Sequence, residues 1–321
     1  MGRVLSCPGR GFRTIMTLAA TRPAPPGLLA ANLICMASMM IWAAGLPAAE
    51  LLIPHVPPIP LAAMRLLLGA ALLLPLWWLL DGWQSLAQAN WGRGIVVGGI
   101  CLGIGAILLI YAQAATDAVT VAVISATAPV VAIALKCLLE ARKVTARLII
   151  GLVLSLIGGL ASYAAAMGSL TLGFGALAAL GSVVAYTWGS RATVTSFPSL
   201  SPVGRTAITV TGAAIVACMV SVVYFSFGGD SPDWAEIGWP EIGALGLYGA
   251  GAIAVSQLLW IMAVGQLGIG MSSLHLNAAP FYVMILLFLL GGAWSWPQAI
   301  GAAVVGLGVL IAQGILRLSR T

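Results

Sequence analysis

Two basic residues, Arg65 and Lys136, lie inside long apolar segments of the chain. A charged side chain in such a segment is energetically costly, so it is a candidate functional group. The guanidinium of Arg65 could bind a carboxylate through two parallel hydrogen bonds. It could equally form a structural ion pair with Glu50, at the end of the preceding apolar segment. For Lys136 the structural alternative is Glu140, which lies four residues later on the same helix face.

A second group of polar residues lies late in the chain, where Ser272, Ser273, His275 and Asn277 occur close together. On a regular helix Ser273, Asn277 and Pro280 share one face, whereas His275 lies about 200° from Asn277. His275 could exchange a proton near neutral pH, or it could be a hydrogen-bonded packing residue. The side chains of His275 and Asn277 are therefore not expected to contact one substrate together.

Prolines interrupt two of the apolar segments, at Pro129 and Pro280. A proline frees a backbone carbonyl within a helix, and in a membrane such a carbonyl must line a protein cavity. Ser125, Pro129 and Lys136 fall on one helix stripe, which is expected to face that cavity. We therefore expect the two prolines to act as paired hinge points beside a polar interior.

Short catalytic signatures are absent from the sequence, which has no P-loop, HExxH or GxSxG motif. Two histidines and eight acidic residues are too few for a metal centre, and no acid is expected in the middle of an apolar segment. The sequence therefore predicts no enzyme, no cofactor and no metal, with an intramembrane lipid-modifying enzyme as an alternative.

The composition sets the class of protein. Only 7% of the 321 residues are charged, 61% are hydrophobic, and the mean hydropathy is +1.08. A soluble domain carries about 25% charged residues, so this chain has too little polar surface for a soluble particle of its size. The net charge of +6 is scattered along the sequence, which argues against a nucleic-acid partner. The composition excludes a cytosolic enzyme and a disordered chain, and it predicts a polytopic membrane protein.

Apolar runs of about 20 residues, the length of a membrane-spanning helix, recur along the chain. They predict an all-α polytopic membrane protein with ten transmembrane helices, at residues 28–49, 60–80, 94–115, 118–139, 147–167, 172–190, 203–227, 242–264, 270–290 and 298–316. Residues 1–27 are basic and contain prolines, so we expect a disordered arm, with either Met1 or Met16 as the start. Residues 317–321 are expected to form a cytoplasmic tail.

The distribution of charge predicts the orientation. Twelve of the fourteen Lys and Arg residues fall on one side of the ten expected helices, and the acidic loop residues fall on the other side. Basic residues mark the cytoplasmic side, so both termini are expected on the cytoplasmic side of a bacterial inner membrane. Tryptophans near the ends of the expected helices are interpreted as interface anchors: Trp77, Trp78, Trp83, Trp91, Trp234, Trp239, Trp294 and Trp296.

The two halves of the chain, 28–168 and 169–316, resemble each other weakly. The corresponding positions are Pro129 and Pro280, Gly151 and Gly301, Gly158 and Gly308, and Arg65 and Arg205. Because each repeat has five helices, an odd number, the second repeat would enter the membrane upside down. Inverted repeats around a central site are typical of secondary transporters, although a duplicated scaffold or sensor would show the same pattern.

The chain resembles the EamA group of the drug/metabolite transporter superfamily along nearly all of residues 28–316. The residues that carry this resemblance are Trp42, Gly45, Arg65, Pro129, Glu140, Ser182, Tyr186, Arg191 and Pro280. The resemblance implies a pseudo-twofold bundle with a substrate cavity near the membrane midplane, and with the fifth and tenth helices at the periphery. Two positions depart from the family: Val183 replaces a frequent tryptophan, and Gly291 replaces an acidic residue at the end of the ninth helix.

The expected function is that of a carrier for small organic metabolites, which alternates access to a central cavity. Amino acids or related amphiphiles moved outward are the first expectation, because similar family members export them. Carriers of drugs, nucleotide-linked compounds or other metabolites, and a non-transporting scaffold or sensor, are the alternatives. The expected partners are a small-molecule substrate and the lipid bilayer, and the chain is expected to be a monomer or a homodimer.

The expected cavity combines residues from several helices. Met36, Met39 and Met40 would form an adaptable apolar wall, or would simply pack. The candidate lining residues are Trp42, Arg65, Tyr111, Gln113, Ser125, Tyr186, Gln257, Trp260, His275 and Asn277.

Overall fold

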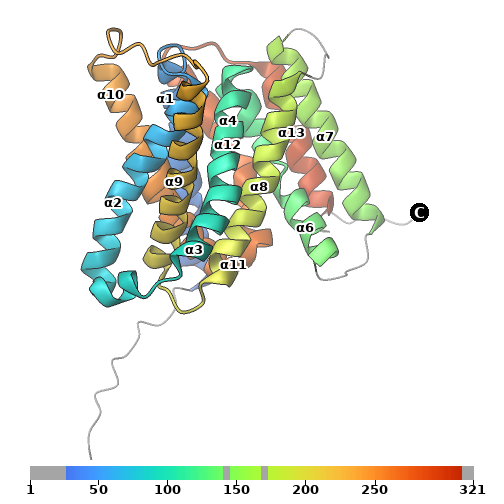
Figure 1. Ribbon diagram of the computed structural model, residues 1–321. Coiled ribbons are helices and arrows are strands. Elements are labelled where there is room, and N and C mark those ends of the chain that lie inside the picture. The colour runs from blue at the N-terminus through green and yellow to red at the C-terminus, as the bar shows by residue number, and fades with distance from the viewer. Residues whose placement is uncertain (1–26, 140–144, 168–172, 313–321) are drawn as a thin grey trace, which may run out of the picture.

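The computed structural model describes residues 27–139, 145–167 and 173–312, and all regular secondary structure in these ranges is helical. The expected N-terminal arm up to residue 26, the end of the last expected helix beyond residue 312 and the expected C-terminal tail lie outside the described residues. Figure 1 shows the helices side by side in one bundle, with α7 and α13 together at one edge and α2 and α10 at the opposite edge.

The helical segments follow one another with short connections. In chain order they are α1 (Leu28–Leu52), α2 (Pro58–Ala87), α3 (Trp91–Ile95), the π-helix η1 (Val96–Gly103), α4 (Ile104–Ala114), α5 (Ala118–Ser125), α6 (Ala128–Leu139), α7 (Ala146–Met167), α8 (Phe174–Ser196), α9 (Pro202–Ser226), α10 (Trp239–Gly246), the π-helix η2 (Leu247–Val255), α11 (Ser256–Ser272), the 3₁₀-helix η3 (Ser273–Ala278), α12 (Ala279–Leu289) and α13 (Trp296–Ala312).

Six helical segments of the described chain are long and apolar enough to cross a membrane: Leu29–Leu52, Pro58–Ala87, Trp91–Ala114, Ala118–Leu135, Pro202–Ser226 and Trp239–Leu289. The expected ten separate spans are not confirmed by this measure. The last segment joins two helices across a kink at Gly268, whose φ of +75° and ψ of 157° are not helical. Two further apolar helices, Ile149–Ala161 and Trp296–Ile311, are shorter than a typical span.

Both prolines that were expected to be hinge points lie in the first turn of a helix. Pro129 is the second residue of α6, directly after the turn that ends α5, and Pro280 is the second residue of α12, directly after η3. Proline is tolerated in the first turn of a helix because the N–H that it lacks would have no helical partner there. The expectation that Ser125, Pro129 and Lys136 share one helix face is wrong. Ser125 ends α5, whereas Pro129 and Lys136 belong to α6, so the three residues do not lie on a single helix.

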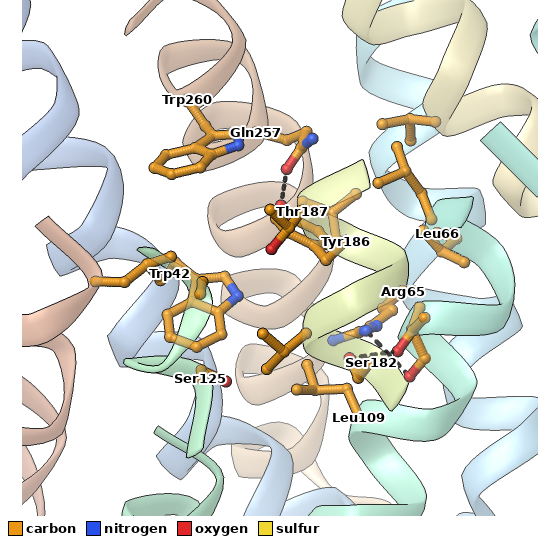
Figure 2. A pocket seen from close by; sticks show the side chains of 18 of the residues that line it. Trp42, Arg65, Leu66, Leu109, Ser125, Ser182, Tyr186, Thr187, Gln257 and Trp260 are labelled. Atoms are coloured by element: carbon orange, nitrogen blue, oxygen red, sulfur yellow. Dashed lines mark hydrogen bonds between the residues drawn. The ribbon is translucent and has the colours of Figure 1, made fainter. Parts of the chain in front are cut away.

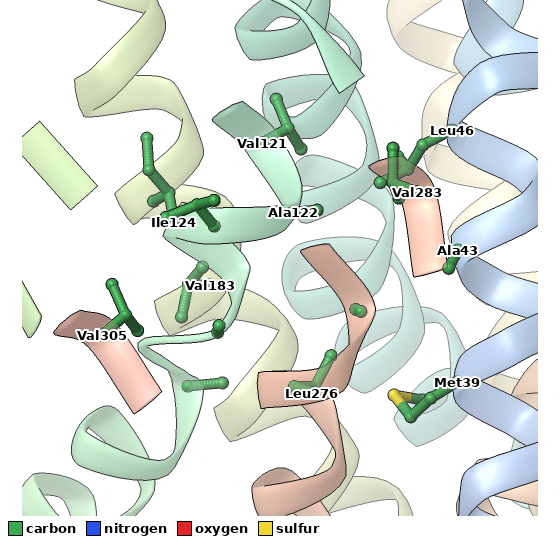
Figure 3. Packing of buried hydrophobic residues seen from close by; sticks show 14 of the residues in the cluster. Met39, Ala43, Leu46, Val121, Ala122, Ile124, Val183, Leu276, Val283 and Val305 are labelled. Atoms are coloured by element: carbon green, nitrogen blue, oxygen red, sulfur yellow. The ribbon is translucent and has the colours of Figure 1, made fainter. Parts of the chain in front are cut away.

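The short helix α5 lies in the middle of the bundle, and all eight of its residues are buried. Figure 3 shows its Val121, Ala122 and Ile124 among side chains from other helices, including Val183 of α8 and Val305 of α13. A helix that is apolar on every side is stable only when other helices surround it. The polar groups of the α5–α6 turn are therefore held deep inside the protein.

Glycines let several helices approach closely. A β-carbon on Gly98 of η1 would lie 2.0 Å from the backbone oxygen of Thr209 in α9. A β-carbon on Gly158 of α7 would lie 2.7 Å from the oxygen of Gly301, and one on Gly308 of α13 would lie 2.8 Å from the oxygen of Gly151. The hydrophobic effect does not drive helices together within a membrane. Small residues at such crossings instead let the helices come close enough for van der Waals packing to hold them.

The eight tryptophans expected to be interface anchors divide into three groups by exposure. Five of the eight expected interface anchors are exposed: Trp78, Trp83, Trp234, Trp239 and Trp296. Trp77 departs from the expectation, because it is fully buried, packs 5.9 Å from the ring of Trp91 and lies against Gly204 of α9. Trp91 and Trp294 are half-buried.

Two carboxylates hold the start of α5. Asp117 accepts hydrogen bonds from the backbone N–H of Thr120 at 2.8 Å and from its hydroxyl at 2.7 Å. The side-chain amide of Gln298 in α13 donates to both oxygens of Asp117, at 3.0 and 3.1 Å. Glu50 of α1 accepts a hydrogen bond from the N–H of Ala118 at 2.6 Å. The cap of α5 thus ties together α1, α5 and α13.

Asp117→Ala is expected to lower the free energy of unfolding by about 1–2 kcal/mol, because it removes the helix cap together with the tie to α13. The melting temperature of the protein in detergent measures this effect. Asp230→Ala, which removes an exposed acid, is the control and should change stability by less than about 0.5 kcal/mol. Equal melting temperatures for the two variants would show that the cap is not stabilising.

Candidate functional site

A cavity lies near the centre of the bundle, between helices from both halves of the chain. Its walls come from α1, α2, η1, α4, α5, α6, α8, α9, η2, α11 and η3 (Figure 2). It leaves about 60 Å³ for the centres of water-sized molecules, which is room for a few waters. In this conformation the cavity is therefore narrow and mostly enclosed by side chains.

Six of the ten candidate residues line this cavity, and they come from five different helices. They are Trp42 of α1, Arg65 of α2, Ser125 of α5, Tyr186 of α8, and Gln257 and Trp260 of α11. In Figure 2 Gln257 lies beside Trp260, whereas Arg65 lies beside Ser182 and Leu109. The cavity is therefore lined by different polar groups at different levels.

The other four candidates lie outside the cavity wall. Tyr111 packs edge-on against Phe174, with ring centroids 6.1 Å apart, and the side-chain amide of Gln113 donates to the backbone oxygen of Leu46 at 2.7 Å.

His275 and Asn277 are in η3, and it is Leu276 between them that lines the cavity. A 3₁₀-helix has three residues per turn, so both neighbours of a residue that faces the cavity point elsewhere.

Arg65 is buried, with only 2% of its surface exposed. One of its terminal nitrogens, Nη2, donates a long hydrogen bond of 3.4 Å to the backbone oxygen of Ala106. The central carbon of the guanidinium lies 4.4 Å from the ring centroid of Tyr248, a cation–π contact. Its Nε has no hydrogen-bond partner within residues 27–139, 145–167 and 173–312. A buried guanidinium with so few partners is unusual, because burial of a charge is costly without compensation.

The ion pair with Glu50 that the sequence offered as an alternative does not account for the charge of Arg65. The carboxylate of Glu50 caps α5 instead of pairing with Arg65, so the structure corrects that alternative. Glu140 and the side chain of Lys136 lie outside the described part of the structure, and their pairing stays a prediction. Arg205, which the sequence repeat paired with Arg65, lies elsewhere and donates to the backbone oxygens of Phe197 and Pro198 at 2.8 and 2.9 Å.

Hydrogen bonds fix several of the polar side chains around the cavity. The hydroxyl of Ser182 donates to the backbone oxygen of Gly105 at 2.8 Å, and the indole N–H of Trp260 donates to the hydroxyl of Ser190 at 2.9 Å. The phenol of Tyr186 donates to the side-chain oxygen of Gln257. The side-chain nitrogen of Gln257 is buried and has no hydrogen-bond partner in the part of the chain that the structure describes.

The remaining walls are mostly apolar. Of the three expected methionines only Met39 lines the cavity, whereas Met36 and Met40 are 40% and 50% exposed on another face of α1. The sequence analysis missed Val210 of α9 and Ile253 of η2, which also line the cavity. Nothing distinguishes these two residues from the many other aliphatic residues in the same helices, so no sequence signal could have identified them. The sequence analysis also missed Thr187, which lines the cavity directly after Tyr186. Its hydroxyl group in an apolar segment is only a weak indication of a cavity residue.

The apolar helices and the central cavity define a multi-pass membrane protein. Residues 29–163 match the EamA-like transporter family, of the drug/metabolite transporter superfamily, and the resemblance inferred from the sequence is confirmed over these residues. No curated protein matches the chain. Fifteen chains of solved structures do match. One of them, a protein crystal structure, is 20% identical and has a TM-score of 0.65, over 90% of this chain and 98% of that chain. At this identity the similarity shows the fold alone.

Proposed function

We propose that this protein is a secondary transporter that exports small organic metabolites carrying a carboxylate, with amino acids and related amphiphiles as first candidates. The observation that carries the proposal is the buried Arg65 in the cavity wall: among the described residues, none is a partner for its Nε and none of those that line the cavity is acidic. A carboxylate would supply the missing charge and hydrogen-bond acceptors in one group. The outward direction rests on the family resemblance.

The start of α6 provides a second argument for an anionic substrate group. Ala128, the first residue of α6, lines the cavity. The N-terminus of a helix carries a partial positive charge, and broken helices in transporters commonly point such ends at anionic substrate groups. This end and Arg65 would attract the same kind of ligand.

Reciprocal contacts between the halves support two inverted five-helix repeats. Helices η1 and α4 pack on α8 and α9, while η2 and α11 pack on α1 and α2. Both segments contain a π-helix at the same place, and each meets the other half through a glycine. Gly98 lies against Thr209, and Gly249 lies against Arg65. An equivalent set of contacts in each half is what a pseudo-twofold axis would produce.

The narrow cavity supports alternating access as the mechanism. Small-molecule pockets usually enclose about 300–1,000 Å³, so this conformation would have to open before a metabolite could enter. The breaks before α6 and α12, with Pro129 and Pro280 in the first turns, are the proposed hinge points. Each break belongs to a different half, so each could open the cavity to a different side of the membrane.

Counterflow in proteoliposomes tests the proposed function. Vesicles loaded with one unlabelled compound at high concentration are diluted into the same labelled compound, across a panel of amino acids and organic acids. Saturable accumulation of one carboxylate class, absent from protein-free vesicles, is the expected result. Counterflow of only uncharged or cationic drugs, or of nucleotide-linked compounds, would show that the substrate belongs to another chemical class. No counterflow by folded, inserted protein would favour a scaffold or sensor.

A further inference from the structure

A polar crevice lies where two turns from different halves of the chain meet. One turn leads from α2 into α3 and the other joins α8 to α9, and both lie at the same end of the bundle (Figure 1). The crevice has a volume of about 350 Å³, against about 60 Å³ for the central cavity, so it has room for a group much larger than water. Six polar residues contribute to its wall: Ser85, Gln88, Asn90, Arg93, Ser196 and Ser199.

Arg93 gives the crevice a positive charge. Its side chain is exposed, and its Nη1 donates a long hydrogen bond of 3.4 Å to the backbone oxygen of Ser196, on the other turn. The described residues that line the crevice include no Asp or Glu. The guanidinium can therefore bind an anion without first leaving a protein carboxylate in the crevice.

The surroundings of the crevice leave its charge positive. Arg205 lies behind the wall, where its Nε donates to the backbone oxygen of the lining residue Phe197 at 2.8 Å. One acid lies at the edge, because Asp81 accepts a hydrogen bond from Ser201, which follows a lining residue. Two guanidiniums thus face one carboxylate, and that carboxylate is already bound to a hydroxyl.

Hydrogen bonds orient two of the polar groups as donors to a ligand. The side-chain oxygen of Asn90 accepts the backbone N–H of Arg93 at 3.0 Å, so the NH₂ group is the end left for a ligand. The hydroxyl oxygen of Ser85 accepts the indole N–H of Trp77 at 3.2 Å, which leaves the hydroxyl proton to be donated. Guanidinium, amide and hydroxyl groups together are typical partners of phosphate oxygens.

The crevice lies at the depth expected for lipid headgroups. Trp78 and Trp83 of α2, shortly before Ser85 in the sequence, are 54% and 65% exposed. Exposed tryptophans at the ends of membrane helices typically lie at the level of the headgroups. Phospholipid phosphates are therefore expected beside the crevice at a far higher local concentration than soluble phosphates.

We infer that this crevice binds the phosphate group of an anionic phospholipid, with Arg93 as its charged contact. Basic pockets between membrane helices on the cytoplasmic side are suited to such headgroups, and this end of the bundle is the one expected to face the cytoplasm. A zwitterionic headgroup fits less well, because its ammonium group would enter a positively charged crevice. The inference does not depend on the proposed carboxylate site in the central cavity.

Native mass spectrometry of the purified protein with dioctanoyl phosphatidylglycerol tests the inference, because it counts bound lipids and gives their dissociation constants. We expect one site that is tighter than the others and that prefers this lipid to dioctanoyl phosphatidylcholine. Arg93→Gln should weaken the tight site about tenfold, the usual effect of removing a hydrogen bond to a charged group. Ser199→Leu, which keeps the charge and narrows the crevice, should weaken it as well.

Arg147→Gln is the matched control, because it removes an exposed guanidinium from α7, at the opposite edge of the bundle from α2 (Figure 1). It should keep the wild-type dissociation constant. An equal loss in Arg147→Gln and Arg93→Gln, or wild-type affinity in Ser199→Leu, would show attraction by net charge without a crevice site, and the inference would be wrong.

Glycerol 3-phosphate and inorganic phosphate distinguish the two sources of the anion. Neither is expected to displace the lipid at comparable concentrations. If either one does, and Arg93→Gln weakens it, the phosphate site stands and its ligand is a soluble phosphate instead of a lipid. If neither the lipid nor the soluble phosphates bind to folded protein, the inference is wrong, and the proposed transport function is unaffected.

Discussion

Replacing Arg65 with alanine, or with methionine of similar volume, is expected to abolish counterflow of carboxylate substrates and to leave the protein folded. The affinity for a carboxylate probe such as 3-phenylpropanoate should fall at least about 30-fold, because removing one partner of a buried charge pair usually costs about 2–5 kcal/mol. Stability should not fall with it. A buried charge with one long hydrogen bond contributes little to folding, and its replacement by an apolar side chain is commonly neutral or stabilising.

Arg205→Met is the matched control for this experiment. It removes a guanidinium that holds the α8–α9 turn through backbone oxygens, away from the cavity. We expect a lower melting temperature and an unchanged dissociation constant for 3-phenylpropanoate, the reverse of the pattern for Arg65. Wild-type affinity in the folded Arg65 variants would contradict the proposed anion site.

The second large effect is expected at the crossing of η1 and α9. Gly98→Ala would place its methyl group 2.0 Å from the backbone oxygen of Thr209, and a backbone atom cannot move aside as a flexible side chain can. The two helices must separate, which is expected to lower the free energy of unfolding by about 3 kcal/mol, at the upper end of typical overpacking effects. Thermal unfolding in detergent, followed by circular dichroism, measures the loss.

Gly265→Ala provides the control, since a β-carbon at Gly265 of α11 meets no atom within 4 Å. It should be neutral or stabilising, because alanine is favoured over glycine within a helix by about 1 kcal/mol. If Gly98→Ala melted at the same temperature as Gly265→Ala, the close crossing of η1 and α9 would be wrong.

The positions of the helices could largely be predicted from the sequence, because long apolar runs bounded by polar residues have few other solutions in a membrane. The expected run 203–227, for example, corresponds to α9 at Pro202–Ser226. An interruption of 118–139 was expected at Pro129, but the end of α5 at Ser125 could not be placed. Residues 126 and 127 are an alanine and a threonine, which tolerate a helix, and the turn there is set by the surrounding helices. The π-helices η1 and η2 likewise depend on contacts between distant segments.

The candidate site was predicted best where a polar or aromatic residue interrupts an apolar helix. Arg65, Tyr186 and Gln257 are such residues, and all three line the cavity. Gln113 has the same appearance in the sequence, yet its amide bonds to a backbone oxygen of α1. The sequence could not distinguish these two situations, because the difference lies in the rotation of each helix about its axis. That rotation is determined by the packing of all its neighbours.

The cavity contains a fixed cation and, among the described residues that line it, no acid, and this has an electrical consequence for the proposed transporter. Arg65 stays with the protein throughout a cycle, so the net charge moved is that of the substrate alone. For a substrate with a single negative charge, a membrane potential of 100 mV, negative inside, contributes about 2.3 kcal/mol to outward movement. That energy corresponds to about a fiftyfold concentration ratio at equilibrium. Such a carrier would export its anion against a gradient without a coupling ion, and an uncoupler that collapses the potential would abolish the accumulation.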